Sequence, residues 1–298
     1  MNISLISCSR NSTLPQSLIK NIEDTIFSPA DDKKYGYEII TIDNSNNHYN
    51  IFQAYNEGVR RSSGEILCFM HDDLEYESVG WGNNVINLFN KYTEAGACAV
   101  VCCTYIKSTP SYYYSDPAFN MMHVQLQNSD GTRSFFYDYL DVDHPCPVVV
   151  FDGLWFCIRR ECFNRISFDE RTYNGFHMYD LDISMQLNLA GYKIFNIPGV
   201  EIFHIAGQAT DKRFWEAAFK FYHKFKNHLP RFSEGTNVSN DKRQQIEKKA
   251  LYSALHNIIR QRIFCLLWKW FSVASEVLGK NKIEATYEVL RFHFTRSN

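Results

Sequence analysis

The chain has 298 residues, of which 45% are hydrophobic and 21% charged, and this ordinary globular usage excludes a disordered or collagen-like chain. The 31 Lys and Arg residues against 33 Asp and Glu residues give a net charge of −2, so no overall basic character predicts nucleic-acid binding. The charge is unevenly distributed, because residues 1–207 hold 14 basic and 25 acidic side chains and residues 208–298 hold 17 and 8. We expect the two parts to face different partners.

Nine cysteines, an odd number, stand mostly in apolar runs, and none forms a C-x-x-C pair. Unpaired thiols in a chain of this size indicate a reducing compartment such as the cytoplasm and disfavour a zinc knuckle. The N-terminus lacks the basic region and long apolar core of a secretory signal. The longest apolar stretch, residues 263–271, is interrupted by Lys269 and is too short to span a bilayer. We therefore expect a soluble protein or one that lies on a membrane surface.

Strand and helix patterns alternate through the first hundred residues. Short apolar runs predict buried strands, and apolar positions that recur every three or four residues predict helices. The predicted strands are residues 3–8, 38–42, 66–70 and 97–106, and the predicted helical faces begin at Leu14, Ile51 and Trp81. This alternation predicts an α/β fold with a mostly parallel, doubly wound sheet and right-handed crossovers.

The pattern changes between residues 109 and 207. Aromatic residues, among them Tyr112–Tyr114, surround an Asp130-Gly131 turn signal that predicts a hairpin or a long loop. Then follow a predicted strand at 148–158, a helix at 179–190, and short strands at 193–197 and 201–204. Beyond Gly207 the pattern is helical only, over residues 214–225, 241–278 with a possible break, and 283–294. We predict a sheet domain over 1–207 and a basic helical extension over 208–298.

Polar residues follow three of the predicted strands where each strand ends. These are Ser7-Cys8-Ser9-Arg10, Asp43-Asn44-Ser45 and His71-Asp72-Asp73. In open α/β sheets, ligands bind outside the carboxyl ends of the strands. Asp, Asn and Ser are also ordinary turn residues, but three such groups at one edge of a sheet predict a binding crevice.

Asp72 and Asp73 form the most specific of these groups. Adjacent carboxylates after a buried strand repel each other, and their joint desolvation is costly without a cation. Mg²⁺ and Mn²⁺ take carboxylate oxygens and share coordination with substrate phosphates. The alternative is a helix N-terminus, whose dipole favours acidic residues, but this explains Glu75 or Glu77 better. The pair therefore predicts a divalent-cation site.

Four segments together resemble the nucleotide-binding half of family 2 glycosyltransferases: Ile3–Ser7, Tyr37–Ser45, Ala54–Gly58 and Ser63–Asp73. The resemblance covers roughly residues 2–207 and implies the GT-A fold, with a nucleotide-sugar half over 1–108 and an acceptor half over 109–207. It implies that Asp43 holds the nucleoside base, Asp72 the ribose and Asp73 a metal ion. The other expected donor-binding residues are Ser7, Ser9, Arg10 and Asn56. His71 stands where many members have a third acidic residue.

The later segments Asp152–Glu161, Phe168–Glu170 and Gly175–Asp182 are similar to the acceptor side of the family and to the stretch that leads to its E-D motif. Tyr179 replaces the Glu of that motif, so the match rests on Asp180 and on Gly191-Tyr192-Lys193. The resemblance implies that Asp180 is the catalytic base and that His204 completes the metal site. Asp152 and Asp182 compete with Asp180, but Asp180 and Asp182 lie about 200° apart on a helix, so only one can face the crevice.

The expected acceptor-side residues are Asp152, Gly153 and Trp155. Trp155 could stack on a sugar face or belong to the core. The C-terminal residues Arg260, Arg262 and Lys269 flank an apolar, aromatic stretch. This pattern is typical of an interfacial helix on anionic lipid or of a helix that packs on the domain, and packing is the commoner outcome.

The resemblance implies a metal-dependent inverting glycosyltransferase that moves a sugar from a nucleotide-sugar donor to a hydroxyl of a glycan or lipid-linked acceptor, in polysaccharide or glycan biosynthesis. Two alternatives remain, a sugar nucleotidyltransferase and a non-catalytic carbohydrate-binding protein. The first would require a Gly-rich phosphate loop after the first strand, where Ser7–Asn11 has no glycine. A nicotinamide enzyme and a P-loop enzyme are disfavoured because their glycine motifs are absent.

Overall fold

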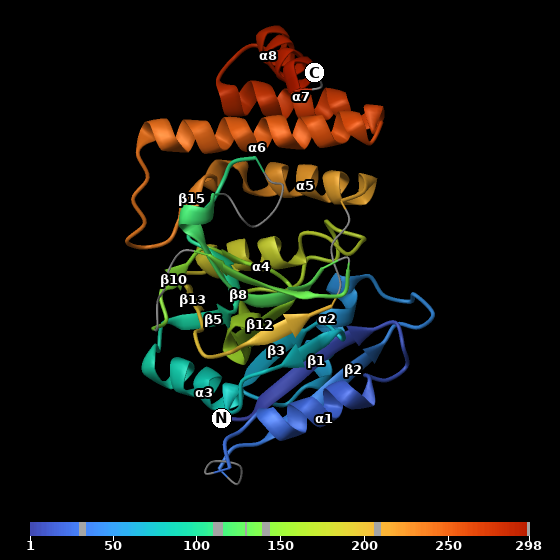
Figure 1. The fold of residues 1–298 in the computed structure, drawn as a ribbon, viewed down its shortest axis with the longest axis vertical. Coiled ribbons are helices and arrows are strands. Elements are labelled where there is room, and N and C mark those ends of the chain that lie inside the picture. Colours follow the sequence, from blue (N-terminus) through green and yellow to red (C-terminus); the bar gives the residue numbers. More distant parts are fainter. Residues whose placement is uncertain (30–33, 110–115, 129, 139–143, 206–209, 297–298) are drawn as a thin grey trace.

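The computed structural model describes residues 1–29, 34–109, 116–128, 130–138, 144–205 and 210–296. Tyr112–Tyr114 and the expected domain boundary at residue 207 lie outside these ranges. Figure 1 shows a sheet domain that carries the N-terminus and a stack of helices that carries the C-terminus.

The larger of the sheets has seven strands. Their order across the sheet is β10 (Pro147–Val148), β13 (Lys193–Asn196), β5 (Ala95–Ala99), β12 (Trp155–Arg159), β3 (Ile66–Met70), β1 (Ile3–Ser9) and β2 (Tyr37–Asp43). Five of the seven strands run in one direction, and β10 and β12 run against their neighbours. The expected mostly parallel α/β sheet is confirmed. The expectation that the second strand is buried is wrong, because β2 is an edge strand and most of its residues are half-buried.

Helices cover both faces of this sheet (Figure 1). Successive strand residues point to opposite faces, so Leu67 and Phe69 belong to one apolar cluster and Cys68 and Met70 to the other. The helices α1 (Gln16–Thr25) and α3 (Trp81–Lys91) pack into the second cluster. The helices α2 (Ile51–Arg61) and α4 (Tyr179–Leu189) pack into the first. The sheet is thus doubly wound.

A smaller sheet contains β11 (Val150–Phe151), β6 (Val101–Cys103), β8 (Asn120–Gln127), β14 (Ile202–His204) and β4 (Leu74–Tyr76), in that order. The strand β9 (Arg133–Asp138) pairs antiparallel with β8, so of the hairpin and the long loop expected around Asp130-Gly131, the hairpin is the one that forms. The antiparallel pairing of β14 with β4 sets His204 opposite Leu74 and therefore beside Asp73. A third, two-stranded sheet joins β7 (Tyr105–Ile106) to β15 (Arg231–Phe232).

Two long stretches that were each predicted to form a single strand are divided among several strands, so these two predictions are wrong. The stretch 97–106 is divided among β5, β6 and β7, which belong to three different sheets, and the stretch 148–158 among β10, β11 and β12. Both stretches are buried throughout, so a continuous apolar run gives no sign of where the chain changes direction. In the second stretch, Asp152 closes a turn by accepting the backbone N–H of Leu154 at 2.9 Å.

The C-terminal helices stack on the sheet domain beyond α4 (Figure 1). They are α5 (Lys212–Phe225), α6 (Asn240–Arg260), α7 (Phe264–Leu278) and α8 (Lys282–Arg296), and three short 3₁₀ turns lie at Pro117–Phe119, Arg160–Asn164 and Lys226–His228. Trp215 of α5 and Trp270 of α7 are fully buried, with ring centroids 5.6 Å apart, in the apolar cluster that also contains α4. These helices therefore pack on the domain. Within the described residues, no helix has both the length and the apolar character needed to cross a bilayer.

Candidate active site

Three neighbouring strands of the large sheet, β2, β1 and β3, end at one edge. Ser9 lies opposite Asp43 in the register of β1 and β2, and the Ser9 hydroxyl donates to Asp72 Oδ2 at 2.6 Å. The exposed Asp43 carboxylate accepts the backbone N–H of Ser45 at 2.9 Å, and this hydrogen bond lowers the pKa of Asp43. The structure therefore brings Asp43, Ser9 and Asp72 to the same edge, and Arg10 is exposed just beyond it.

The structure does not bring Ser7 and Asn56 to this edge as available groups. Ser7 lies inside β1 with 1% exposure, and its hydroxyl has no hydrogen-bond partner among the described residues. The Asn56 amide donates to the carbonyl of Phe168 at 2.9 Å and accepts its N–H at 3.1 Å. Asn56 therefore anchors the segment at Phe168 to α2, and its prediction as a donor-binding residue is not supported.

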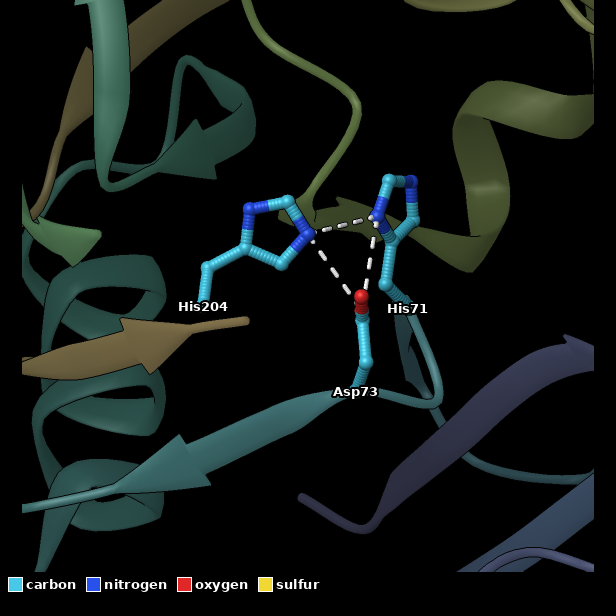
Figure 2. Close-up of side chains that lie close together, drawn as sticks. All are labelled: His71, Asp73 and His204. Carbon is cyan, nitrogen blue, oxygen red and sulfur yellow. Dashed lines mark hydrogen bonds and ion pairs between the residues drawn. The ribbon is translucent and has the colours of Figure 1, made fainter. Parts of the chain in front are cut away.

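Two histidines and a carboxylate face one another beside this edge (Figure 2). His71 and Asp73 lie in the turn between β3 and β4, and His204 ends β14. His204 Nε2 is 3.3 Å from His71 Nδ1 and 3.3 Å from Asp73 Oδ1, and His71 Nδ1 is 3.9 Å from Asp73 Oδ1. The two predicted metal ligands, Asp73 and His204, thus lie together. His71 lies beside both, although it was not predicted to be a ligand. The signal for His71 was its position two residues before Asp73.

The protonation states of this cluster suit a cation. Burial, and then the nearby His204, lower the pKa of His71 to about 4, so its imidazole is neutral. Burial opposes the charge of Asp73, but the facing His204 and His71 outweigh it and hold the pKa of the Asp73 carboxyl below its usual value. Asp73 Oδ1 is buried and has no hydrogen-bond partner among the described residues. This oxygen and the two imidazole nitrogens that face it lie within 4.8 Å of one another, and such a set of ligand atoms fits a divalent cation.

The hydroxyl of Tyr179 determines how His71 faces this cluster. It donates to the carbonyl of Gly153 at 3.0 Å, so it has no second hydrogen for His71 Nε2, which also lies at 3.0 Å. Nε2 of His71 must therefore carry the hydrogen and donate to Tyr179. The lone pair of His71 is then on Nδ1, which faces Asp73 and His204, and a fixed tautomer of this kind is typical of metal-binding histidines.

Asp180 and Asp152 form a buried pair on the other side of Gly153. Asp180 accepts the backbone N–H of Gly153 at 3.1 Å and of Leu181 at 2.9 Å. Burial, and then the charge of Asp152, raise the pKa of Asp180 to about 7, and burial also raises the pKa of Asp152. Asp182 points elsewhere, because Lys224 of α5 pairs with it at 2.7 Å.

Gly153 and Trp155 have structural surroundings. A Cβ atom on Gly153 would lie 2.1 Å from the Tyr179 hydroxyl oxygen, so only glycine admits Tyr179 at this position. Trp155 has 0% exposure, donates to the Tyr76 hydroxyl at 3.0 Å and lies edge-on to Trp81. No face of the Trp155 ring is free for a sugar, so its expected place on the acceptor side is corrected to the core.

Residues 4–228 match the family described as "Glycosyltransferase like family". The chain belongs to this family. No curated protein matches the sequence.

Solved glycosyltransferase structures share the fold. The crystal structure of GalNAc-T7 with UDP, GalNAc and Mn²⁺ is 12% identical with a TM-score of 0.50, and the match covers 76% of this chain and 49% of that one. The chain thus spans about half the length of GalNAc-T7. The structure of S. aureus TarS 1–349 is 11% identical with a TM-score of 0.50, and its complex with UDP-GlcNAc is 9% identical with a TM-score of 0.52; each match covers 93% of this chain and 80% of that one. These likenesses establish the GT-A fold.

In this glycosyltransferase-like chain, the candidate metal ligands and the buried carboxyl pair are linked by one short path. His71 contacts Tyr179, Tyr179 contacts the carbonyl of Gly153, and the N–H of Gly153 contacts Asp180. The chemistry available here is of two kinds. Three donor atoms can hold a cation, and a carboxyl group with a pKa near 7 can take up a proton near neutral pH.

Proposed function

We propose that this protein transfers a sugar from a nucleotide-sugar donor to a hydroxyl acceptor, with a divalent cation held by His71, Asp73 and His204. The observation that carries the proposal is the grouping of Asp73 Oδ1 with one ring nitrogen of His71 and one of His204, all within 4.8 Å of one another. Family membership and the GT-A fold support a nucleotide-sugar donor, and the related structures contain UDP or UDP-GlcNAc.

The proposed reaction is a single displacement with inversion. When bound, the cation would offset the negative charge of the departing diphosphate. Asp180 accepts the proton of the acceptor hydroxyl while the oxygen of that hydroxyl bonds to the anomeric carbon of the donor sugar. The electron pair of the broken bond between the anomeric carbon and the phosphate oxygen leaves with the diphosphate. Asp43 holds the base of the nucleoside, and Ser9 orients Asp72 toward the ribose.

The ligand atoms of the proposed metal site, two imidazole nitrogens and one carboxylate oxygen, favour Mn²⁺ over Mg²⁺. Mg²⁺ prefers an all-oxygen shell and keeps several waters, whereas two imidazole nitrogens suit a more borderline ion. GalNAc-T7 was solved with Mn²⁺, which supports the same choice.

Calorimetric titration of UDP with and without Mn²⁺ tests the metal site. We expect Asp73→Asn to remove the Mn²⁺-dependent part of the affinity, because the variant lacks the only charged ligand. Glu75→Gln is the matched control, since Glu75 pairs with Arg133 at 2.8 Å and should keep Mn²⁺-dependent binding.

Unchanged Mn²⁺-dependent affinity in Asp73→Asn would remove Asp73 from the metal site. Release of UDP from UDP-sugars, measured across a panel of sugars, separates an enzyme from a carbohydrate-binding protein. If the protein binds every UDP-sugar in the panel but releases UDP from none of them, the proposed transferase activity is contradicted.

The C-terminal helices support a proposal about location. Phe264 and Trp268 of α7 are 62% and 74% exposed, and Lys282 lies 5.9 Å from the Trp268 ring. Exposed aromatic side chains beside cations suit a surface of anionic lipid. All nine cysteines lie in the described residues, and none of them forms a disulfide there. We therefore place the enzyme in a reducing compartment such as the cytoplasm, in peripheral contact with a membrane.

A further inference from the structure

A cavity of about 350 Å³ lies between the segment 173–177, α5 and α7. The helix α5 contributes Arg213, Glu216 and Lys220, which recur at the spacing of one helical face, and α7 contributes Lys269. The cavity is therefore built from the stretch that leads to Asp180, from α5, and from α7, which lies beyond the end of the family match at residue 228.

The cavity has an excess of positive charge. Lys220 donates to the carbonyl of Thr172 at 2.8 Å, and Lys269 Nζ lies 5.5 Å from the ring of Phe219. Among the described residues, neither ammonium group forms an ion pair with a carboxylate. The acidic groups nearby are already matched, Glu216 with Lys212 at 3.5 Å and Asp211 with Arg213 at 2.9 Å.

Phosphate is the anion that best fits this arrangement. Two exposed lysines without carboxylate partners, on two helices, line one partly open cavity, so a ligand with more than one negative charge is favoured over a single carboxylate. A phosphate monoester carries a charge of about −1.5 to −2 at neutral pH and accepts hydrogen bonds through several oxygens. Lysine binds phosphate as a mobile point charge and does not need the flat geometry that arginine requires.

The cavity is close to the candidate active site. His177 lines it, while the ring of the preceding residue, Phe176, lies 6.0 Å from the ring of His71 on the other side of the segment. Asp180 follows His177 by three residues, so their Cα atoms are at most about 11 Å apart. The backbone of Asp180 thus lies within the length of a small acceptor molecule from a residue that lines the cavity.

We propose that this cavity binds a phosphate group of the acceptor, so that the acceptor is a phosphate-bearing molecule whose hydroxyl reaches Asp180. This inference rests on the proposed glycosyl transfer. The phosphate can belong to a lipid, whose apolar part would lie along the exposed Phe264 and Trp268, or to a soluble phosphorylated glycan.

Titration of the intact chain with inorganic pyrophosphate, in EDTA to keep the metal site empty, tests the site. We expect saturable binding that weakens at least tenfold in the double variant Lys220→Gln/Lys269→Gln. The matched control is Lys20→Gln/Lys91→Gln, which removes the same charge from α1 and α3 and should bind like the parent.

A second arm identifies the source of the phosphate. Phosphatidylcholine vesicles with and without phosphatidic acid are sedimented with the parent, the lysine double variant and Trp268→Ser. Lysine-dependent binding to phosphatidic acid that Trp268→Ser also weakens supports a lipid phosphate. Lysine-dependent binding of pyrophosphate without such vesicle binding supports a soluble acceptor.

Absence of saturable pyrophosphate binding, or equal binding by the parent and the lysine double variant, overturns the inference. This failure differs from failure of the proposed transfer, because Mn²⁺-dependent binding of UDP is measured separately and should be unchanged in Lys220→Gln/Lys269→Gln.

Discussion

Tyr179 stands where the family resemblance expects a glutamate, and its hydroxyl fixes the tautomer of His71. Tyr179→Phe removes the acceptor for His71 Nε2–H and frees the ring to turn. Loss of such an outer hydrogen bond typically weakens metal binding 10- to 100-fold, so we expect Mn²⁺ affinity to fall by about tenfold or more. Mn²⁺ titration followed by electron paramagnetic resonance measures the change.

Tyr192→Phe serves as the control, since Tyr192 lies away from the metal ligands, under Arg165. Circular dichroism reports whether each variant folds. If folded Tyr179→Phe binds Mn²⁺ as tightly as the parent, the hydroxyl does not position His71.

Asp180→Asn separates proton transfer from binding. The amide cannot take the acceptor proton, so we expect transfer to fall about 10²-fold or more while donor binding persists. Asp152→Asn and Asp182→Asn provide the comparison. Near-parental transfer by Asp180→Asn, together with a large loss in either comparison variant, would assign the base elsewhere.

The same substitution changes how stability depends on pH. The pKa of Asp180 is raised from 3.8 to about 7 in the folded protein. The contribution of the protonated Asp180 to the free energy of unfolding is therefore complete below pH 4, and it is lost as the pH rises through 7. Asn does not ionise and avoids this loss. We therefore expect the melting temperature of Asp180→Asn, relative to the parent, to rise between pH 5 and pH 8, by on the order of a few degrees. A relative melting temperature that stays constant or falls contradicts the raised pKa.

Sequence patterns could identify the polar residues at the strand ends because parallel topology alone brings them to one edge. They could not separate Asp180 from Asp182, which are both acidic and both buried, since the distinction depends on Lys224 of α5. They also could not place Trp155, because an apolar run has the same appearance in a core and beside a ligand.

At the scale of elements, Lys224 joins α5 to the sheet domain. Its ammonium group contacts Asp182 of α4 and Asp169, each at 2.7 Å, and Asp182 is 1% exposed. Removal of one partner of a buried pair leaves an uncompensated charge, so we expect Lys224→Met to lower the free energy of unfolding by about 3 kcal/mol. Urea denaturation measures this loss.

Lys226→Met is the matched control, because Lys226 pairs with Glu276 near the surface and should cost less than about 1 kcal/mol. Burial raises the pKa of Asp182, and without Lys224 this effect grows. The deficit of Lys224→Met should therefore be larger at pH 8 than at pH 5. Equal losses in the two variants would show that the contact to Asp182 does not stabilise the pairing of α4 and α5.

The strand order could not be derived from apolar runs. A strand buried on both faces shows no alternation, so the bends that send β5, β6 and β7 into separate sheets leave no mark in the pattern. Most of the helices were easier to predict because they have a polar face, although α4 is buried on all sides. The predicted break between 241 and 278 lies at residues 261–263.

At the scale of the whole molecule, the C-terminal helices complete the apolar core. Trp270 of α7 packs on Trp215 of α5, so deletion of 241–298 uncovers a large apolar surface. We expect the truncated chain to aggregate, while the fraction that stays soluble keeps most of its affinity for UDP. Size-exclusion chromatography and calorimetry measure the two effects. A truncated chain that stays monomeric would contradict this packing role.

The double variant Phe264→Ser/Trp268→Ser tests membrane contact without removing the core. Both side chains are exposed, so the fold should persist while salt-sensitive sedimentation with anionic vesicles decreases. If the parent shows no such sedimentation, the helices serve packing alone.

The ligands of the candidate metal site lie far apart along the chain, with His71 and His204 separated by 133 positions. A partly folded chain in which β14 has not yet paired with β4 therefore offers an incomplete set of donors. The proposed cation would therefore select the finished fold, and at a concentration one hundred times its Kd it would add about 2.7 kcal/mol to the stability of that fold by mass action. With such a site, the cation supply of the cell would also influence how much of this chain escapes proteolysis.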